Sequence, residues 1–184
     1  MSSPTNNTVT SKYILITAVA VAASWVLHEL AHWTAGTLLG YEMGMTLNNA
    51  FLVSGKFSSD WHYQLVSAAG PVFTLLEAVV VFFIMRRKKI VSLYPFLFTC
   101  FYMRLFAAVI TIRNPNDEAR VSESLGLGTF VLPVIVTAIL FFLLYKTSVR
   151  YKFSTRFNVI NPGLIILFSS VIILADQFFH IRLL

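Results

Sequence analysis

Long apolar runs dominate this sequence and restrict its fold more than any other feature. Five of them are close to the roughly 20 residues that a helix needs to cross a bilayer. Only 12% of the 184 residues are charged, whereas a soluble domain has about 25%. We therefore predict an all-α polytopic membrane protein that forms one membrane-embedded domain over residues 1–184. The expected spans cover about residues 13–39, 61–85, 90–112, 125–145 and 164–179, and Asn161-Pro162-Gly163 is expected to break the chain just before the last one.

The segment of residues 41–60, between the first two spans, has a different pattern. Two short extended runs, residues 43–47 and 51–53, lie on either side of Asn48 and Asn49. This pattern is typical of a small β-hairpin with a polar turn. An ordinary loop at the membrane surface is the alternative, and the sequence does not decide between the two.

The basic residues gather in a few places along the chain. Nine of the fourteen are Lys12, four residues in the turn 86–89 and four in the loop 146–156, which five spans place on one side of the membrane. The positive-inside rule makes that side cytoplasmic. The net charge of +6 is therefore a feature of membrane loops and does not indicate nucleic acid. We expect a multi-pass protein of a prokaryotic cytoplasmic membrane, in contact with the lipid bilayer and of undetermined oligomeric state.

The first span contains the motif His28-Glu29-Leu-Ala-His32. Residues four apart lie on one face of a helix, so both imidazoles can bind one zinc ion, and Glu29 can act as the general base. Ionisable groups in a span cost about 2.5–3.5 kcal/mol each, so three together indicate a function. A polar cluster that packs helices together is the alternative.

A catalytic zinc site needs a third protein ligand, for which we choose Asp117. It follows a helix end broken by proline, on the same side of the membrane as the motif. Glu77 is expected toward the opposite side, and His62 lies at an interface where histidines are common. Asp176 matches Arg104 in depth, and a buried arginine needs a carboxylate, so we predict an Arg104–Asp176 pair.

Together these motifs resemble the site-2 protease family of intramembrane zinc metalloproteases. The resemblance rests on the motif from His28 to His32 in a span, Ala68-Ala-Gly-Pro71 in the next span, and the later Asp117 after an Asn-Pro element. The stretch between the first two spans also resembles the hairpin region of that family. Two positions depart from the family pattern: Thr74 stands where an Asn is usual, and Glu118 stands where a Gly usually follows the aspartate.

The resemblance and the residue chemistry agree on hydrolysis of a peptide bond in a transmembrane segment of a protein substrate. His28, His32 and Asp117 would hold one Zn²⁺, with Glu29 as the base. The resemblance implies that Asn114 donates a hydrogen bond to the oxyanion, and a hairpin edge could take the unwound substrate as an added strand. It also implies a site near the cytosolic face, whereas the charge count places the site near the outer face. Orientation therefore stays open.

Two other functions remain for such a sequence. A non-catalytic membrane protein could keep the zinc site to hold a client helix, and the departures at Thr74 and Glu118 favour this alternative. A small metal transporter would need acidic or histidine residues along a path through the membrane, whereas here they gather on one side.

Overall fold

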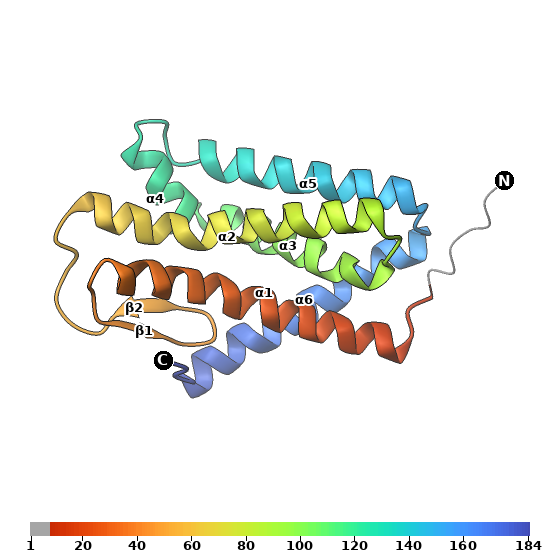
Figure 1. Cartoon of the computed structure of the whole chain (residues 1–184), viewed down its shortest axis with the longest axis horizontal. Coiled ribbons are helices and arrows are strands. Elements are labelled where there is room, and N and C mark those ends of the chain that lie inside the picture. Colours follow the sequence, from red (N-terminus) through yellow and green to blue (C-terminus); the bar gives the residue numbers. More distant parts are fainter. Residues whose placement is uncertain (1–7) are drawn as a thin grey trace.

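The computed structural model describes residues 8–184, and most of them lie in long helices that run side by side (Figure 1). Five segments are long and apolar enough to cross a membrane, so the predicted all-α polytopic fold is confirmed. The long helices are α1 (Ser11–Leu38), α2 (Asp60–Arg87), α3 (Tyr94–Ile110), α5 (Val131–Tyr151) and α6 (Thr155–Phe179). A 3₁₀ turn, η1 (Val91–Leu93), leads into α3, and a short helix, α4 (Asp117–Ser124), lies between α3 and α5.

Polar side chains determine where several helices begin. In each case a hydroxyl or amide oxygen just before the helix accepts a hydrogen bond from the backbone N–H of the third helical residue. These capping residues are Thr10 for α1, Ser59 for α2, Asn116 for α4 and Ser154 for α6. The cap at Asn116 matters most for function, because it makes Asp117 the first residue of α4.

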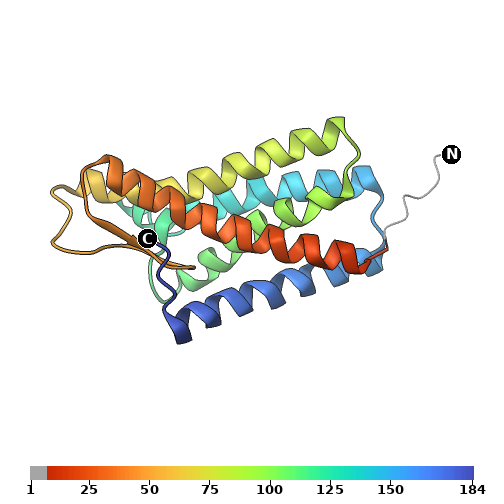
Figure 2. The ribbon, with the colours of Figure 1, turned by 60° about the horizontal axis from the view of Figure 1, so that its bottom comes forward.

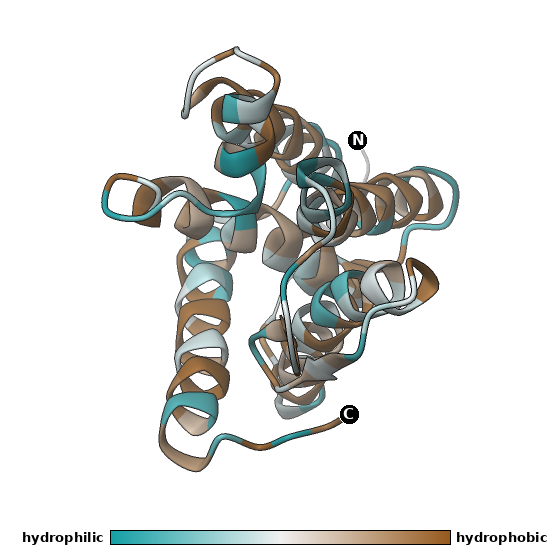
Figure 3. Ribbon diagram, turned by 90° about the vertical axis from the view of Figure 1, so that its left-hand side faces the viewer, coloured by the Kyte–Doolittle hydropathy of each residue, from teal (hydrophilic) through white to brown (hydrophobic). Residues whose placement is uncertain are grey.

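The outside of the bundle is apolar, as contact with lipid requires. Hydrophobic residues, brown in Figure 3, occur along all the long helices, and side chains such as Leu15, Phe141 and Phe178 are more than half exposed. Inside, the largest cluster of buried side chains joins several helices, and Ala78 of α2 and Leu97 of α3 are completely buried in it. Exposed apolar surface of this extent marks a membrane protein.

The predicted hairpin is confirmed, and the loop alternative is wrong. Strand β1 (Met43–Met45) pairs antiparallel with β2 (Ala50–Leu52). The opposite edge of β1 pairs with the end of the chain, where the Met45 N–H donates to the Leu184 carbonyl at 3.1 Å (Figure 2). Trp33 Nε1 donates to the Met43 carbonyl at 3.0 Å and fixes the hairpin to α1. Within residues 8–184, β2 pairs only with β1, and its outer edge is free.

The predicted span boundaries hold within a few residues for the first three spans, and the last two need correction. The fourth span begins at Val131 and not near residue 125, because Gly126 and Gly128 adopt positive φ and form a turn before it. The last span begins at Thr155 and not at residue 164, so the expected break at Pro162 is wrong. Proline is tolerated inside membrane helices where neighbours support the backbone. Here the Tyr13 hydroxyl donates to the buried Asn161 side chain at 2.7 Å, which ties α6 to α1.

The two ends of the bundle differ in character (Figure 1). The start of α1, the α2–α3 turn and the α5–α6 turn lie at one end, as the sequence predicts. The hairpin, α4 and the end of the chain lie at the other end. The helices therefore bring the hairpin close to the half of α1 that carries the histidine motif.

Candidate metal centre

The two histidines of the motif lie on the buried face of α1, as their spacing predicts. His28 is 3% exposed and His32 is 7% exposed. Their Nε2 atoms lie 3.2 Å apart. Residues four apart in a helix stack one turn above the other, and the rings here meet edge to face.

Residues of α2 orient both rings. The Nδ1 atom of His32 lies 2.6 Å from the Val66 carbonyl oxygen, which can only accept, so this nitrogen carries a proton. The Nδ1 atom of His28 lies 3.0 Å from the Thr74 hydroxyl oxygen. That hydroxyl donates to the Gly70 carbonyl at 3.0 Å, so its oxygen accepts from His28. In neutral rings, both Nε2 atoms are thus left with a free electron pair that points at the same place.

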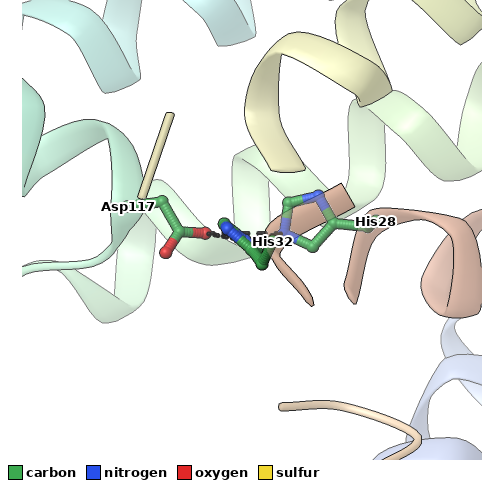
Figure 4. A group of neighbouring side chains, drawn as sticks. All are labelled: His28, His32 and Asp117. Carbon is green, nitrogen blue, oxygen red and sulfur yellow. Dashed lines mark hydrogen bonds and ion pairs between the residues drawn. The ribbon is translucent and has the colours of Figure 1, made fainter. Parts of the chain in front are cut away.

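Asp117 completes the group, as predicted (Figure 4). Its Oδ2 atom lies 3.4 Å from Nε2 of both His28 and His32. Its Oδ1 atom accepts a hydrogen bond from Arg120 Nη2 at 2.6 Å, which turns the free oxygen toward the histidines.

The chain after α3 brings Asp117 to the depth of the histidines. Helix α3 ends at Ile110, two residues before the predicted boundary. A short turn then leads to α4, which packs against α2 and α5. Because α3 ends early, Asp117 at the start of α4 lies level with the two histidines, and its Oδ2 atom is 3.4 Å from Nε2 of each.

Gly70 leaves room for the group. A Cβ atom at this position would meet the ring nitrogens of both His28 and His32. The resemblance drew attention to the Ala-Ala-Gly-Pro motif, and the structure gives a reason for its glycine: α2 approaches α1 closely where the three ligand atoms converge.

Glu29 and Asn114 line a cavity of about 300 Å³ that opens beside the group. Glu29 is 7% exposed and shares this cavity with His32 and Asp117, so it faces the place where a substrate would meet the three ligand atoms. Asn114 lines the same cavity from the turn after α3. The hairpin forms another wall through residues 48–52, which include the whole of β2.

The predicted Arg104–Asp176 pair is wrong. Arg104 Nη1 donates to Glu118 Oε1 at 3.0 Å, and both side chains are only 4% exposed. Asp176 instead accepts hydrogen bonds from the Thr46 hydroxyl at 2.9 Å and the Leu47 N–H at 3.1 Å. Depth alone suggested the wrong partner, because Glu118 at the start of α4 is buried next to Arg104.

Arg104 also lies beside the metal ligands, which the sequence did not predict. Its Nη2 atom lies 3.3 Å from His28 Nε2, and its Nη1 atom lies 3.9 Å from Asp117 Oδ2. A fixed guanidinium at this place adds positive charge to the site, and Glu118 offsets part of it. Two features of the sequence could have indicated this contact: an arginine inside an apolar span, and Glu118 directly after the predicted ligand Asp117.

Two weaker candidates for the third ligand lie elsewhere. Glu77 accepts a hydrogen bond from the Ser24 hydroxyl at 2.7 Å, deeper in the bundle. His62, in the first turn of α2, contacts the Tyr41 hydroxyl at 2.8 Å. Within residues 8–184, only His28, His32 and Asp117 form a group of three or more potential metal ligands.

We compared the chain with profiles of protein families, with curated proteins and with solved structures, and none of them matches it.

Proposed function

We propose that this protein is an intramembrane zinc metalloprotease of a prokaryotic cytoplasmic membrane, with a transmembrane protein as its substrate. The observation that carries the proposal is the convergence of His28, His32 and Asp117 beside a cavity that Glu29 also lines. Two imidazoles, one carboxylate and an adjacent glutamate form the set of groups that metal-assisted hydrolysis uses.

The three ligand atoms fit a zinc ion. Ligands bound to zinc at about 2.0–2.2 Å in a tetrahedron would lie about 3.3–3.6 Å from one another. The three separations here are 3.2, 3.4 and 3.4 Å. The hydrogen bonds to Thr74 and Val66 leave each Nε2 free to bind, which is the orientation that metal-bound histidines usually have. His28, His32 and Asp117 would hold the ion, and three protein ligands is the number that catalytic zinc sites use.

The residues around the candidate metal site would each take one role in the reaction. When bound, zinc supplies Lewis acidity, which lowers the pKa of water and polarises a carbonyl group. Glu29 takes the proton from the attacking water and later delivers it to the leaving amine. Asn114 donates a hydrogen bond to the developing oxyanion from the cavity wall. Arg104 adds positive charge beside the same atoms, which favours the negative charge that develops on the substrate.

The free edge of β2 suits an unwound substrate. A helix hides its carbonyl groups in its own hydrogen bonds, so a transmembrane substrate must unwind before cleavage. In an antiparallel pair, backbone groups point alternately toward the partner strand and away from it. Thr46 pairs with Asn49 and Glu42 with Val53, so the N–H groups of Ala50 and Leu52 point away from β1. They border the cavity, where an extended peptide can add as a strand.

A non-catalytic protein that holds a client helix, and keeps either a zinc site or only its polar residues, is the second candidate. One observation favours it: the Arg104 guanidinium lies close enough to His28 Nε2 to compete with a metal ion for that nitrogen. In this alternative Glu118 serves only to balance the buried arginine.

The replacement Glu29→Gln separates the two candidates, because it keeps the shape of the side chain and removes the base. We expect the purified wild-type protein in detergent to cleave a test transmembrane substrate. The variant should cleave it at least about a hundred times more slowly, because a general acid–base group typically contributes a rate factor of that size or more. Equal cleavage by both proteins would exclude Glu29 as the base. If neither protein cleaves the substrate and both bind the client helix equally well, the non-catalytic alternative is favoured.

A further inference from the structure

The end of the bundle opposite the metal centre carries positive charge with no negative charge of its own. Nine of the fourteen basic residues lie there, in the start of α1 and in the α2–α3 and α5–α6 turns. Of the eight acidic residues of the chain, the nearest in sequence is Glu77, about 15 Å before the end of α2. The others belong to the motif, the hairpin, the start of α2, α4 and the end of α6. Within residues 8–184, no ion pair joins Arg86, Lys146 or Arg150 to a carboxylate.

Three of the cations form one edge of a groove between α2 and α5. The groove has a volume of about 460 Å³ and is lined by Phe82, Arg86, Phe142, Lys146, Val149 and Arg150. The helix period explains the arrangement, because each aromatic residue lies four positions before a cation on the same helix. Phe82 precedes Arg86 on α2, and Phe142 precedes Lys146 on α5.

Contacts within the groove hold these groups in place. The Arg86 guanidinium carbon lies 5.7 Å from the centre of the Phe82 ring, and Lys146 Nζ lies 5.4 Å from the centre of the Phe142 ring. Arg150 Nη2 donates to the Arg86 carbonyl at 3.1 Å, which links the two helices. Among residues 8–184, this is the one hydrogen bond found for the three cations, so their other N–H groups can face a ligand from outside the chain.

The groove is polar at its outer end and apolar toward the middle of the membrane. The aromatic residues lie one turn, about 5.4 Å, further into the bilayer than the cations. A ligand that fits must therefore have an anionic head at the membrane surface and an apolar part that extends along Phe82 and Phe142. Basic pockets between transmembrane helices bind lipid head groups in this manner.

We propose that the groove between α2 and α5 binds an anionic phospholipid, with its phosphate held by Arg86, Lys146 and Arg150 and an acyl chain along Phe82 and Phe142. A soluble phosphate would use the cations but leave the apolar wall uncovered. The acyl chain accounts for both parts of the groove. This site is independent of the metal centre, because it lies at the opposite end of the bundle (Figure 1).

The test compares retained lipid by native mass spectrometry of the whole protein released from detergent micelles. The probes are phosphatidylglycerol, phosphatidylcholine of the same acyl chains, and inorganic phosphate. The groove variant is Arg86→Gln/Lys146→Gln/Arg150→Gln. Its matched control, Arg87→Gln/Lys88→Gln/Lys89→Gln, removes the same charge from the adjoining turn. Metal content and thermal unfolding of both variants should equal those of the wild type, which shows that they fold.

We expect the wild type and the control to retain at least ten times more phosphatidylglycerol than phosphatidylcholine, and the groove variant to lose this preference. Equal losses in both variants would overturn the site, because they would mean that the lipid responds only to the total charge of this end. Displacement of phosphatidylglycerol by inorganic phosphate at equal concentration would also overturn it, since the apolar wall would then contribute nothing.

Discussion

Replacement of Gly70 by alanine should remove the metal without removing any ligand. Gly70 lies in α2, where the helix passes close to the rings of His28 and His32. An alanine normally favours a helix over glycine by about 1 kcal/mol, so the backbone itself gives no reason for harm. Any loss must come from the collision between the new methyl group and the two rings.

The structure gives the size of this collision. Ordinary contacts of a Cβ atom span 3.4–4 Å, whereas the Cβ of an alanine at Gly70 would lie 2.7 Å from His28 Nε2. The ring must therefore withdraw by about 0.7 Å, whereas metal–ligand distances vary by only about 0.2 Å. The hydrogen bonds of Nδ1 to Thr74 and Val66 oppose this movement. Loss of a residue that hydrogen-bonds to a metal ligand typically lowers metal affinity about 10–100-fold. We expect Gly70→Ala to lower it by at least as much, because it displaces the ligands themselves.

Competition with a chelator of known affinity measures this change on the purified protein. The matched control is Gly163→Ala in α6, where a Cβ atom meets no other atom within 4 Å. Thermal unfolding of both variants shows whether the helices still pack. If Gly70→Ala binds metal within threefold of Gly163→Ala, then the three ligand atoms do not form the binding site, and the reasoning fails.

Three further predictions follow from the contacts around the site. Thr74→Val should weaken metal binding about 10–100-fold while Thr74→Ser keeps it, because only serine can accept from His28 Nδ1; equal chelator titrations of the two would contradict this. Arg104→Met and Glu118→Leu should each lower the free energy of unfolding by about 3–5 kcal/mol, because each leaves a buried charge unpaired. In denaturant titrations, the double variant should be more stable than either single variant. Leu52→Pro should impair substrate cleavage but not metal content, because it removes an N–H at the free edge of β2. Leu52→Ala controls for loss of the side chain, and equal cleavage by the two variants would exclude the hairpin from the mechanism.

Features that depend on spacing within one helix could be predicted from the sequence. Two histidines four residues apart in an apolar run must share a face of α1, and the structure has them there. The Asn48-Asn49 turn between two short extended runs predicted the hairpin for the same kind of local reason. Asp117 was predicted from its side of the membrane, which the number of spans determines.

Features that depend on contacts between helices could not be predicted in this way. The partner of Arg104 is Glu118, because the short helix α4 buries this carboxylate beside the arginine, and the depth of a residue within its span does not reveal such a contact. Thr74 looked like a departure from the family pattern, yet its hydroxyl orients His28. Pro162 predicted a helix end by its local chemistry, but the packing of α6 against α1 keeps the helix continuous.

The number of zinc ions bound per chain tests the central claim most directly. It should be measured by elemental analysis of protein purified in detergent with zinc present, for the wild type, Glu29→Gln, Asp117→Ala and Asp176→Ala. We expect one ion per chain in all of them except Asp117→Ala, because Glu29 and Asp176 are not ligands. Loss of zinc from Asp176→Ala with retention in Asp117→Ala would reverse the assignment of the third ligand. A wild-type protein without zinc would contradict the metal centre and the proposed protease together.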